Sequence, residues 1–100
     1  MFLAKVVGSV VSTQKDPKLV GLKLLLVQHL NLDIEPTKSF VVAADSVGAG
    51  NGEVVVCATG SSARLTEETE GLPVDAVIMA IVDSMDIHGQ IKYDKSQEGA

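Results

Sequence analysis

Residues 45 to 53 read Asp-Ser-Val-Gly-Ala-Gly-Asn-Gly-Glu, with Phe-Val-Val-Ala-Ala at 40–44 before them and Val-Val-Val-Cys-Ala at 54–58 after them. Three glycines within five positions allow positive φ angles, and Asn-Gly at 51–52 is preferred in tight turns between antiparallel strands. The stretch therefore predicts a hairpin. Both flanks are rich in β-branched residues and nearly free of charge, which is typical of strands buried on both faces. One thin sheet of this size achieves that only if it closes on itself or meets another subunit.

The composition indicates one small domain with little attraction for anions. The chain has 100 residues, of which 46% are hydrophobic and 3% aromatic, and its net charge is −5. One core is expected at this length, although so short a chain buries a limited apolar area and gains from a partner. Negative charge and scarce aromatic residues disfavour nucleic acid and anionic membranes. We therefore expect a protein that binds neither nucleic acid nor membranes.

Cys57 is the single cysteine of the chain and lies among valines and alanines. A lone cysteine excludes an internal disulfide, and apolar neighbours favour a buried side chain over a reactive thiolate. The first residues enter directly into a strand pattern rather than a signal peptide, and no apolar run approaches the roughly 18 residues of a membrane span. These features predict a cytoplasmic protein.

Alternation of apolar and polar residues predicts strands along most of the chain. Gly8 interrupts the apolar face of the first strand and marks a bend, as a small closed barrel requires. The leucine-rich run Leu22–Leu30 has no clear period, but its length and its position between two strands favour a strand over a helix. A loop at 14–21, with a turn at Asp16-Pro17, precedes this run, and a polar loop at 31–39 follows it.

The predicted fold is all-β: a small closed antiparallel barrel of the OB type with one short helical turn near Ser61–Leu65. Its strands are expected at Phe2–Thr13, Leu22–Leu30, Phe40–Val47, Glu53–Thr59 and Val74–Ile87. A turn at 88–90 leads to a short last strand at 91–93. The barrel domain is expected to span residues 1–93, and residues 94–100 to form a flexible polar tail.

The sequence presents no clear set of catalytic or metal-binding residues. The glycines at 48–52 resemble a phosphate-binding loop, but a strand rather than a helix follows them. The serines at 61 and 62 lack the Gly-x-Ser-x-Gly pattern of a nucleophile elbow, and His29 has no partner at metal-ligand spacing. Arg64 lies in an apolar neighbourhood and is expected to form a structural ion pair with Asp45 or Asp83. We expect no enzyme, no cofactor and no metal.

Six short motifs occur in a fixed order along the chain. They are Leu-Ala-Lys-Val-Val-Gly at 3–8, Val-Val-Ser-Thr-Gln-Lys at 10–15, Gly at 21 with Lys-Leu-Leu-Leu-Val-Gln at 23–28, Asp-Ser-Val-Gly-Ala-Gly at 45–50, Gly-Ser-Ser-Ala-Arg at 60–64, and Pro-Val-Asp-Ala at 73–76 with Ile-Val-Asp at 81–83. Over about residues 1–93 the chain resembles the EutN/CcmL family, the pentameric vertex proteins of bacterial microcompartment shells.

This resemblance implies an OB-like barrel, a homopentamer, and closure of the vertices of a protein shell that encloses metabolic enzymes. The implied partners are the hexameric shell proteins of the same microcompartment, and no chemistry is implied. The sequence leaves open whether the shell is a carboxysome or a catabolic metabolosome.

The surplus of apolar strand surface is expected to lie in subunit contacts, because it exceeds what one barrel interior can cover. In a five-fold ring some backbone segment must approach its symmetry mates closely. Gly48, Ala49 and Gly50 have missing or minimal side chains and are the candidate lining of a narrow central pore. The alternative is that the glycines serve only their own hairpin.

Two other classes of function are alternatives to the shell protein. An OB-type module that binds single-stranded nucleic acid or a small ligand needs a basic groove or stacking aromatic residues, whereas Phe2, Phe40 and Tyr93 are the only aromatic residues of this acidic chain. A small enzyme would need titratable side chains that converge in a pocket, and the sequence shows no such set.

Overall fold

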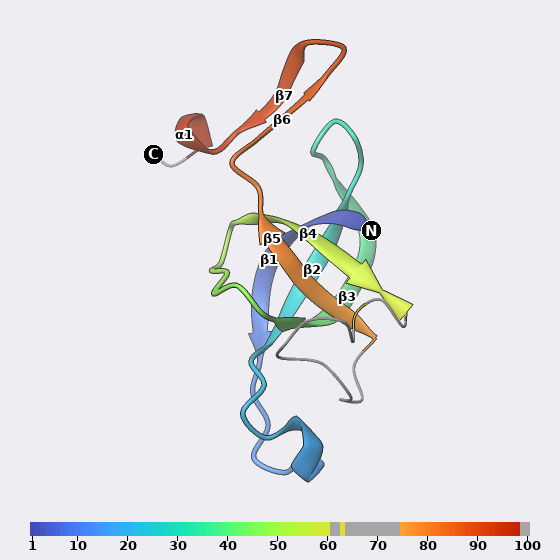
Figure 1. The fold of residues 1–100 in the computed structure, drawn as a ribbon, viewed down its shortest axis with the longest axis vertical. Coiled ribbons are helices and arrows are strands. Elements are labelled where there is room, and N and C mark those ends of the chain that lie inside the picture. The colour runs from blue at the N-terminus through green and yellow to red at the C-terminus, as the bar shows by residue number, and fades with distance from the viewer. Residues whose placement is uncertain (61–62, 64–74, 99–100) are drawn as a thin grey trace.

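Five strands close into a barrel, and two further strands form a hairpin that projects from it (Figure 1). The computed structural model of the chain describes residues 1–60, 63 and 75–98. In chain order the elements are β1 (Phe2–Val10), the 3-10 helix η1 (Pro17–Leu19), β2 (Leu24–Leu30), β3 (Pro36–Asp45), β4 (Val54–Thr59), β5 (Ala76–Ile81), β6 (Ser84–Ile87), β7 (Gln90–Asp94) and α1 (Lys95–Glu98). The predicted all-β fold with a small closed barrel is confirmed. Within the described residues, no helix is long and apolar enough to cross a membrane.

The strands of the barrel are ordered β1-β2-β3-β5-β4, so that β5 lies between β3 and β4. Its pairs are antiparallel except for β3 and β5, which run parallel, with Ala44 opposite Val77. The expectation of an entirely antiparallel barrel is therefore wrong at this pair. A parallel pair needs a long connection, and here the connection contains β4.

The stretch from Asp45 to Glu53 is not a hairpin, because β3 pairs with β2 and β5 whereas β4 pairs with β1 and β5. The glycines do allow the chain to turn, with φ angles of 77° at Gly48 and 84° at Gly52. The turn leads the chain to β1 instead. The amide of Gly52 donates to the carbonyl of Val6 (2.8 Å), and the amide of Val6 donates to the carbonyl of Glu53 (3.0 Å). Turn residues thus predicted a change of direction but not the strand that the chain meets next.

Small aliphatic side chains fill the interior of the barrel. The buried cluster consists of Ala4, Val6, Leu25, Val27, Ala43, Ala49, Val55, Cys57, Ala76 and Ile78. A barrel of five strands has a narrow interior, which suits a core of valines and alanines. Cys57 is fully buried, as expected, and burial raises the pKa of its thiol to about 12, so the thiol stays protonated at neutral pH.

The first two strands follow the sequence prediction closely. The register between β1 and β2 shifts between Val6 and Gly8, which is a bulge at the predicted bend. The run that begins at Leu22 contains β2 and is a strand rather than a helix, as predicted. However, β1 ends at Val10 rather than Thr13, and η1 occupies part of the predicted loop at 14–21.

The third strand begins earlier than expected, at Pro36 rather than at Phe40. The polar residues at 37–39 belong to β3, and the predicted loop at 31–39 shrinks to a tight turn. Asn31 organises this turn, because its side-chain oxygen accepts hydrogen bonds from the amides of Asp33 (2.9 Å) and Glu35 (3.0 Å).

The predicted strand Val74–Ile87 is in fact two strands, β5 and β6, which belong to different sheets. The partner of β5 in the barrel is β4, which begins at Val54, and the amide of Val82 makes the last bond to it, at the carbonyl of Val54 (2.8 Å). Beyond Val82 the chain leaves the barrel because the neighbouring strand has ended. The apolar face on even positions ends at Val82 and continues with the polar residues Ser84 and Asp86, a change of pattern that the prediction of one strand overlooked.

The projecting hairpin pairs β6 with β7 through a turn at 88–89, where His88 has a φ angle of 51°. Residues 94–100 are predicted to form a polar tail, and within them Asp94 ends β7 while Lys95–Glu98 form α1. The predicted helical turn at Ser61–Leu65 lies outside the described residues except for Ala63, which is buried.

Candidate functional site

The loop between β3 and β4 wraps around the carboxylate of Asp45, the residue that ends β3. This carboxylate is 2% exposed and accepts hydrogen bonds from the amides of Val47 (3.1 Å), Gly48 (3.1 Å) and Ala49 (3.0 Å). Consecutive amides that point at one centre form an anion-binding nest. Here the nest is filled by a side chain of the same loop, which fixes the loop rather than leaving it open to a ligand.

The three candidate pore residues lie together in this loop but face different ways. Ala49 is 1% exposed and its methyl group packs into the core of its own barrel. Gly48 and Gly50 are exposed to solvent. The part of the loop that could border an opening is therefore the backbone at the two glycines, with Ala49 acting as its anchor.

Glu53 holds the second half of the loop. Its Oε1 accepts the amide of Gly50 (2.6 Å), and its own amide donates to the carbonyl of Gly50 (3.2 Å). Its Oε2 binds the ammonium group of Lys95 in α1 (2.5 Å). The bond to Lys95, together with the Gly50 amide, lowers the pKa of the Glu53 carboxyl, and the same bond raises the pKa of Lys95.

The predicted ion pair of Arg64 with Asp45 or Asp83 stays a prediction, because Arg64 lies outside the described residues. Lys23 is a cation that the structure does place near Asp45, with its Nζ 3.8 Å from Oδ2. This pair was missed, although the register between β2 and β3 could have indicated it. Leu24 lies opposite Ala44, so the preceding residue Lys23 comes beside Asp45.

Two rows of apolar side chains point outward from the barrel. The first, the β1-β4-β5 row, contains Leu3, Val56 and Ala80, which are paired across the three strands. The second, the β2-β3 row, contains Leu26 and its partner Val42, with Phe40 further along β3. Together the strands of the two rows make up the complete wall of the barrel, so the two rows face different directions.

An apolar groove borders the β1-β4-β5 row. It is lined by Met1, Phe2, Leu3, Leu30, Asn31, Leu32 and Val56. The barrel therefore presents two different apolar surfaces on different sides. Two such surfaces allow one barrel to contact two neighbours.

The aromatic residues do not form a platform for stacking bases. Phe2 is stacked on His29, with ring centroids 4.0 Å apart, and Tyr93 is 7% exposed. Phe40 alone of the three is largely exposed. Within residues 1–60, 63 and 75–98, no group of three His, Cys, Asp or Glu side chains is placed to hold a metal ion.

Comparison with known proteins shows which family the chain belongs to. The profile of the family described as "Ethanolamine utilisation protein EutN/carboxysome" matches residues 1–83. The chain belongs to the EutN/CcmL family. The carboxysome shell vertex protein CcmL of Synechocystis sp. is 44% identical over 99% of both chains, and the microcompartment shell vertex protein PduN of Salmonella typhimurium is 48% identical over 85% of this chain and 98% of its own.

Solved structures of EutN/CcmL proteins share the fold. CcmL of Gloeobacter violaceus has a TM-score of 0.92 and 42% identity, with 96% of this chain and 99% of the other covered. The pentameric microcompartment shell protein GrpN of Rhodospirillum rubrum has a TM-score of 0.79 and 45% identity, with 87% and 100% covered. The resemblance seen in the sequence motifs is thereby confirmed. The relatives come from carboxysomes and from other microcompartments alike.

Proposed function

We propose that the chain assembles into a homopentamer that closes the vertices of a bacterial microcompartment shell. The observation that carries this proposal is the presence of two outward apolar rows on different sides of one barrel. A ring forms when each subunit presents two different surfaces that fit each other, because the contact repeats around an axis until it closes. The number of subunits is taken from the pentameric relative in Rhodospirillum rubrum.

In this ring the β2-β3 row of one subunit lies against the β1-β4-β5 row of its neighbour. Phe40 and Val42 are 54% and 46% exposed in the single chain, and together they offer an exposed apolar surface. The groove lined in part by Leu3 and Val56 is the surface proposed to receive them. Removing such side chains from water stabilises the contact by about 25 cal/mol for each Å² of apolar area buried.

The loop at 48–50 is proposed to border the opening on the five-fold axis. The exposed backbone of Gly48 and Gly50 allows close approach by the same loop of other subunits, while Ala49 anchors the loop in its barrel. Gly50 is the best position for a test, because a Cβ added there would meet only the Glu53 Oε1 atom, at 3.5 Å. Gly48 is unsuitable, because its φ of +77° disfavours any side chain.

Hexameric shell proteins of the same microcompartment are the proposed partners. A flat sheet of six-fold units closes into a polyhedron only where five-fold units replace some of them, so the role of the pentamer is geometric. This role requires no catalysis, and we propose a structural protein rather than an enzyme. Membership in the EutN/CcmL family favours this role over binding of nucleic acid or of a small ligand.

Production of the chain together with hexameric shell proteins tests this function. Electron microscopy is expected to show closed polyhedral shells when the chain is present, and open or elongated assemblies when it is left out. Val56→Asp, which places a charge in the β1-β4-β5 row, is expected to behave like the omission. Shells that close equally well without the chain would contradict the proposal.

A further inference from the structure

Three separate parts of the chain meet at Glu53. The Gly50 amide of the loop donates to Oε1 of Glu53 (2.6 Å), and the Val6 amide of β1 donates to the backbone carbonyl of Glu53 (3.0 Å). The Lys95 ammonium group of α1 binds Oε2 of Glu53 (2.5 Å). The α1 segment is otherwise remote from this loop in sequence, since 42 residues separate Glu53 and Lys95.

We propose that Lys95 is a positioning residue that latches the C-terminal segment onto Glu53 and thereby sets the conformation of the loop at 48–53. The proposal rests on the proposed function in one respect, which is that this loop borders the five-fold opening. The latch then ties the shape of the opening to the C-terminal segment of the same subunit.

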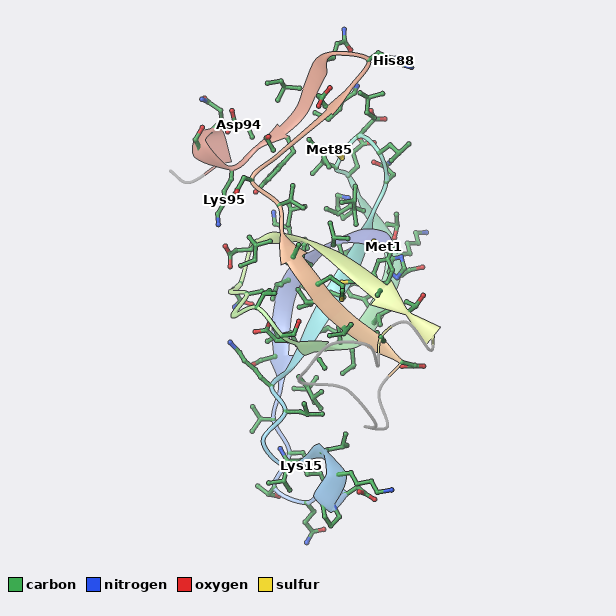
Figure 2. All side chains as sticks on the ribbon, in the orientation of Figure 1. Met1, Lys15, Met85, His88, Asp94 and Lys95 are labelled. Carbon is green, nitrogen blue, oxygen red and sulfur yellow. The ribbon has the colours of Figure 1, made fainter. Side chains whose placement is uncertain are left out.

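The backbone of Lys95 is held by hydrogen bonds that do not involve Glu53. Its amide donates to the carbonyl of Asp83 (2.8 Å), at the point where the chain leaves the barrel. The carboxylate of Asp94 accepts the amide (3.0 Å) and the hydroxyl (2.7 Å) of Ser96, which holds the first turn of α1. Figure 2 shows the Lys95 side chain extending from α1 toward the barrel. The ammonium group is therefore held near Glu53 by a fixed backbone.

The two oxygens of the Glu53 carboxylate perform different tasks. Oε2 binds Lys95, while Oε1 binds the amide of Gly50 and so closes the turn at 50–53. The side chains of Glu53 and Lys95 are 22% and 43% exposed, so solvent screens this partly exposed pair less than it screens a fully exposed one. Without the ammonium group the carboxylate gains by turning toward water, and the Gly50 amide then loses its acceptor.

The ion pair between Lys92 and Asp33 provides a contrast. Lys92 of β7 binds Asp33 at 3.3 Å, and the Asp33 side chain is 66% exposed. The backbone hydrogen bonds of this turn go to Asn31, not to the carboxylate of Asp33. Lys92→Ala therefore removes a lysine of β7, the strand that leads into α1, without touching the loop at 48–53, and it is the matched control.

Amide hydrogen exchange in the assembled protein, resolved at Gly50 and Gly52, measures the latch. Lys95→Ala is expected to raise the exchange rate of the Gly50 amide about fivefold or more. The Gly52 amide, which donates to Val6 of β1, is expected to keep its rate. Glu53→Gln should raise the exchange rate of the Gly50 amide in the same way. Lys95→Arg, which keeps the positive charge, and Lys92→Ala should both leave this rate at its native value. An unchanged Gly50 rate in both Lys95→Ala and Glu53→Gln would overturn the latch.

Cross-linking separates the latch from the position of the loop in the ring. Gly50→Cys adds the only accessible thiol among the described residues, since the native Cys57 is buried. A short bis-maleimide is expected to link subunits through this thiol, and adding Lys95→Ala is expected to change the rate of linking. Exchange that responds without any link between subunits leaves the latch standing and removes the loop from the axis. Links between subunits with exchange that does not respond retain the axial loop and overturn the latch.

Discussion

In the barrel each strand has two neighbours, whereas in the projecting hairpin β6 and β7 have only each other within the described residues. The barrel buries a continuous cluster from all five of its strands, and Tyr93 is the one buried side chain that the described part of the hairpin contributes. Two-stranded hairpins are marginally stable alone. The hairpin is therefore held by contacts at its base, namely Tyr93, the Lys92–Asp33 pair and the Lys95–Glu53 pair.

The difference shows how a small chain can divide its tasks. The barrel is stable through its own core, which leaves its outer rows available for neighbouring subunits. The hairpin and α1 contribute little to that core but reach back to the loop at 48–53 through Lys95. Substitutions in the two regions should therefore differ in both the size and the kind of their effects.

The largest effect is expected from the core of the barrel. Ile78→Ala leaves a cavity around a fully buried side chain and should lower the free energy of unfolding by about 2–5 kcal/mol. Ile91→Ala in the hairpin, at a side chain 66% exposed, should change it by less than about 0.5 kcal/mol. Denaturant unfolding at one fixed subunit concentration measures both variants, because assembly contributes to the apparent stability. Equal losses from the two variants would contradict the division between barrel and hairpin.

The next effect is on assembly rather than on folding. Val56→Asp places a charge in the β1-β4-β5 row, and burying it unpaired between subunits should weaken assembly by about 3 kcal/mol, or roughly 100-fold. The circular dichroism spectrum should stay that of the barrel, because Val56 points outward. Thr59→Asp, at an exposed residue of the same strand, should leave assembly intact. Loss of the folded spectrum in Val56→Asp would place that side chain in the core instead.

Asp45→Ala should have a smaller but clear effect. It removes the acceptor of the Val47, Gly48 and Ala49 amides and should lower the free energy of unfolding by about 2 kcal/mol. Asp33→Ala, which removes an exposed ion pair with Lys92, should lower it by less than about 1 kcal/mol. A thermal or denaturant scan compares the two. If Asp33→Ala were the more damaging, the nest around Asp45 would not be what fixes the loop.

The smallest effect is the pH dependence of the Glu53–Lys95 pair. The pKa of Glu53 is lowered from 4.5, so its contribution is full above pH 4.5 and is lost as the pH falls through the folded pKa. The pKa of Lys95 is raised from 10.5, so its contribution is full below pH 10.5 and is lost as the pH rises through the folded pKa. The stability difference between the native chain and Lys95→Met should be constant between these limits and shrink outside them. A difference that does not vary at either extreme would deny the pair any role.

The parts of the fold that depend on local alternation can be predicted from the sequence. The strands β1, β2 and β4, the bend at Gly8 and the burial of Cys57 all follow from side chains that alternate along a strand or cluster within it. These features need no knowledge of distant parts of the chain. They were correspondingly predicted to within a few residues.

The parts of the fold that depend on pairing between distant strands do not follow from the sequence pattern. The Asn51-Gly52 turn was correctly placed, but β5 enters between β3 and β4, so the turn joins two strands that belong to different pairs. The segment Val74–Ile87 leaves the barrel after Val82, where β4 begins at Val54, and the polar residues Ser84 and Asp86 change the pattern there without showing that a second sheet begins. For the same reason the sequence indicated a surplus of apolar surface but not the rows that carry it.

The mass of the native chain in solution tests the central claim most directly. Native mass spectrometry or sedimentation at micromolar concentration should give five times the mass of one chain, with Val56→Asp measured alongside as the variant that dissociates. A native chain that stays a stable, folded monomer under these conditions would contradict the claim that the outward apolar rows of the barrel are subunit contacts.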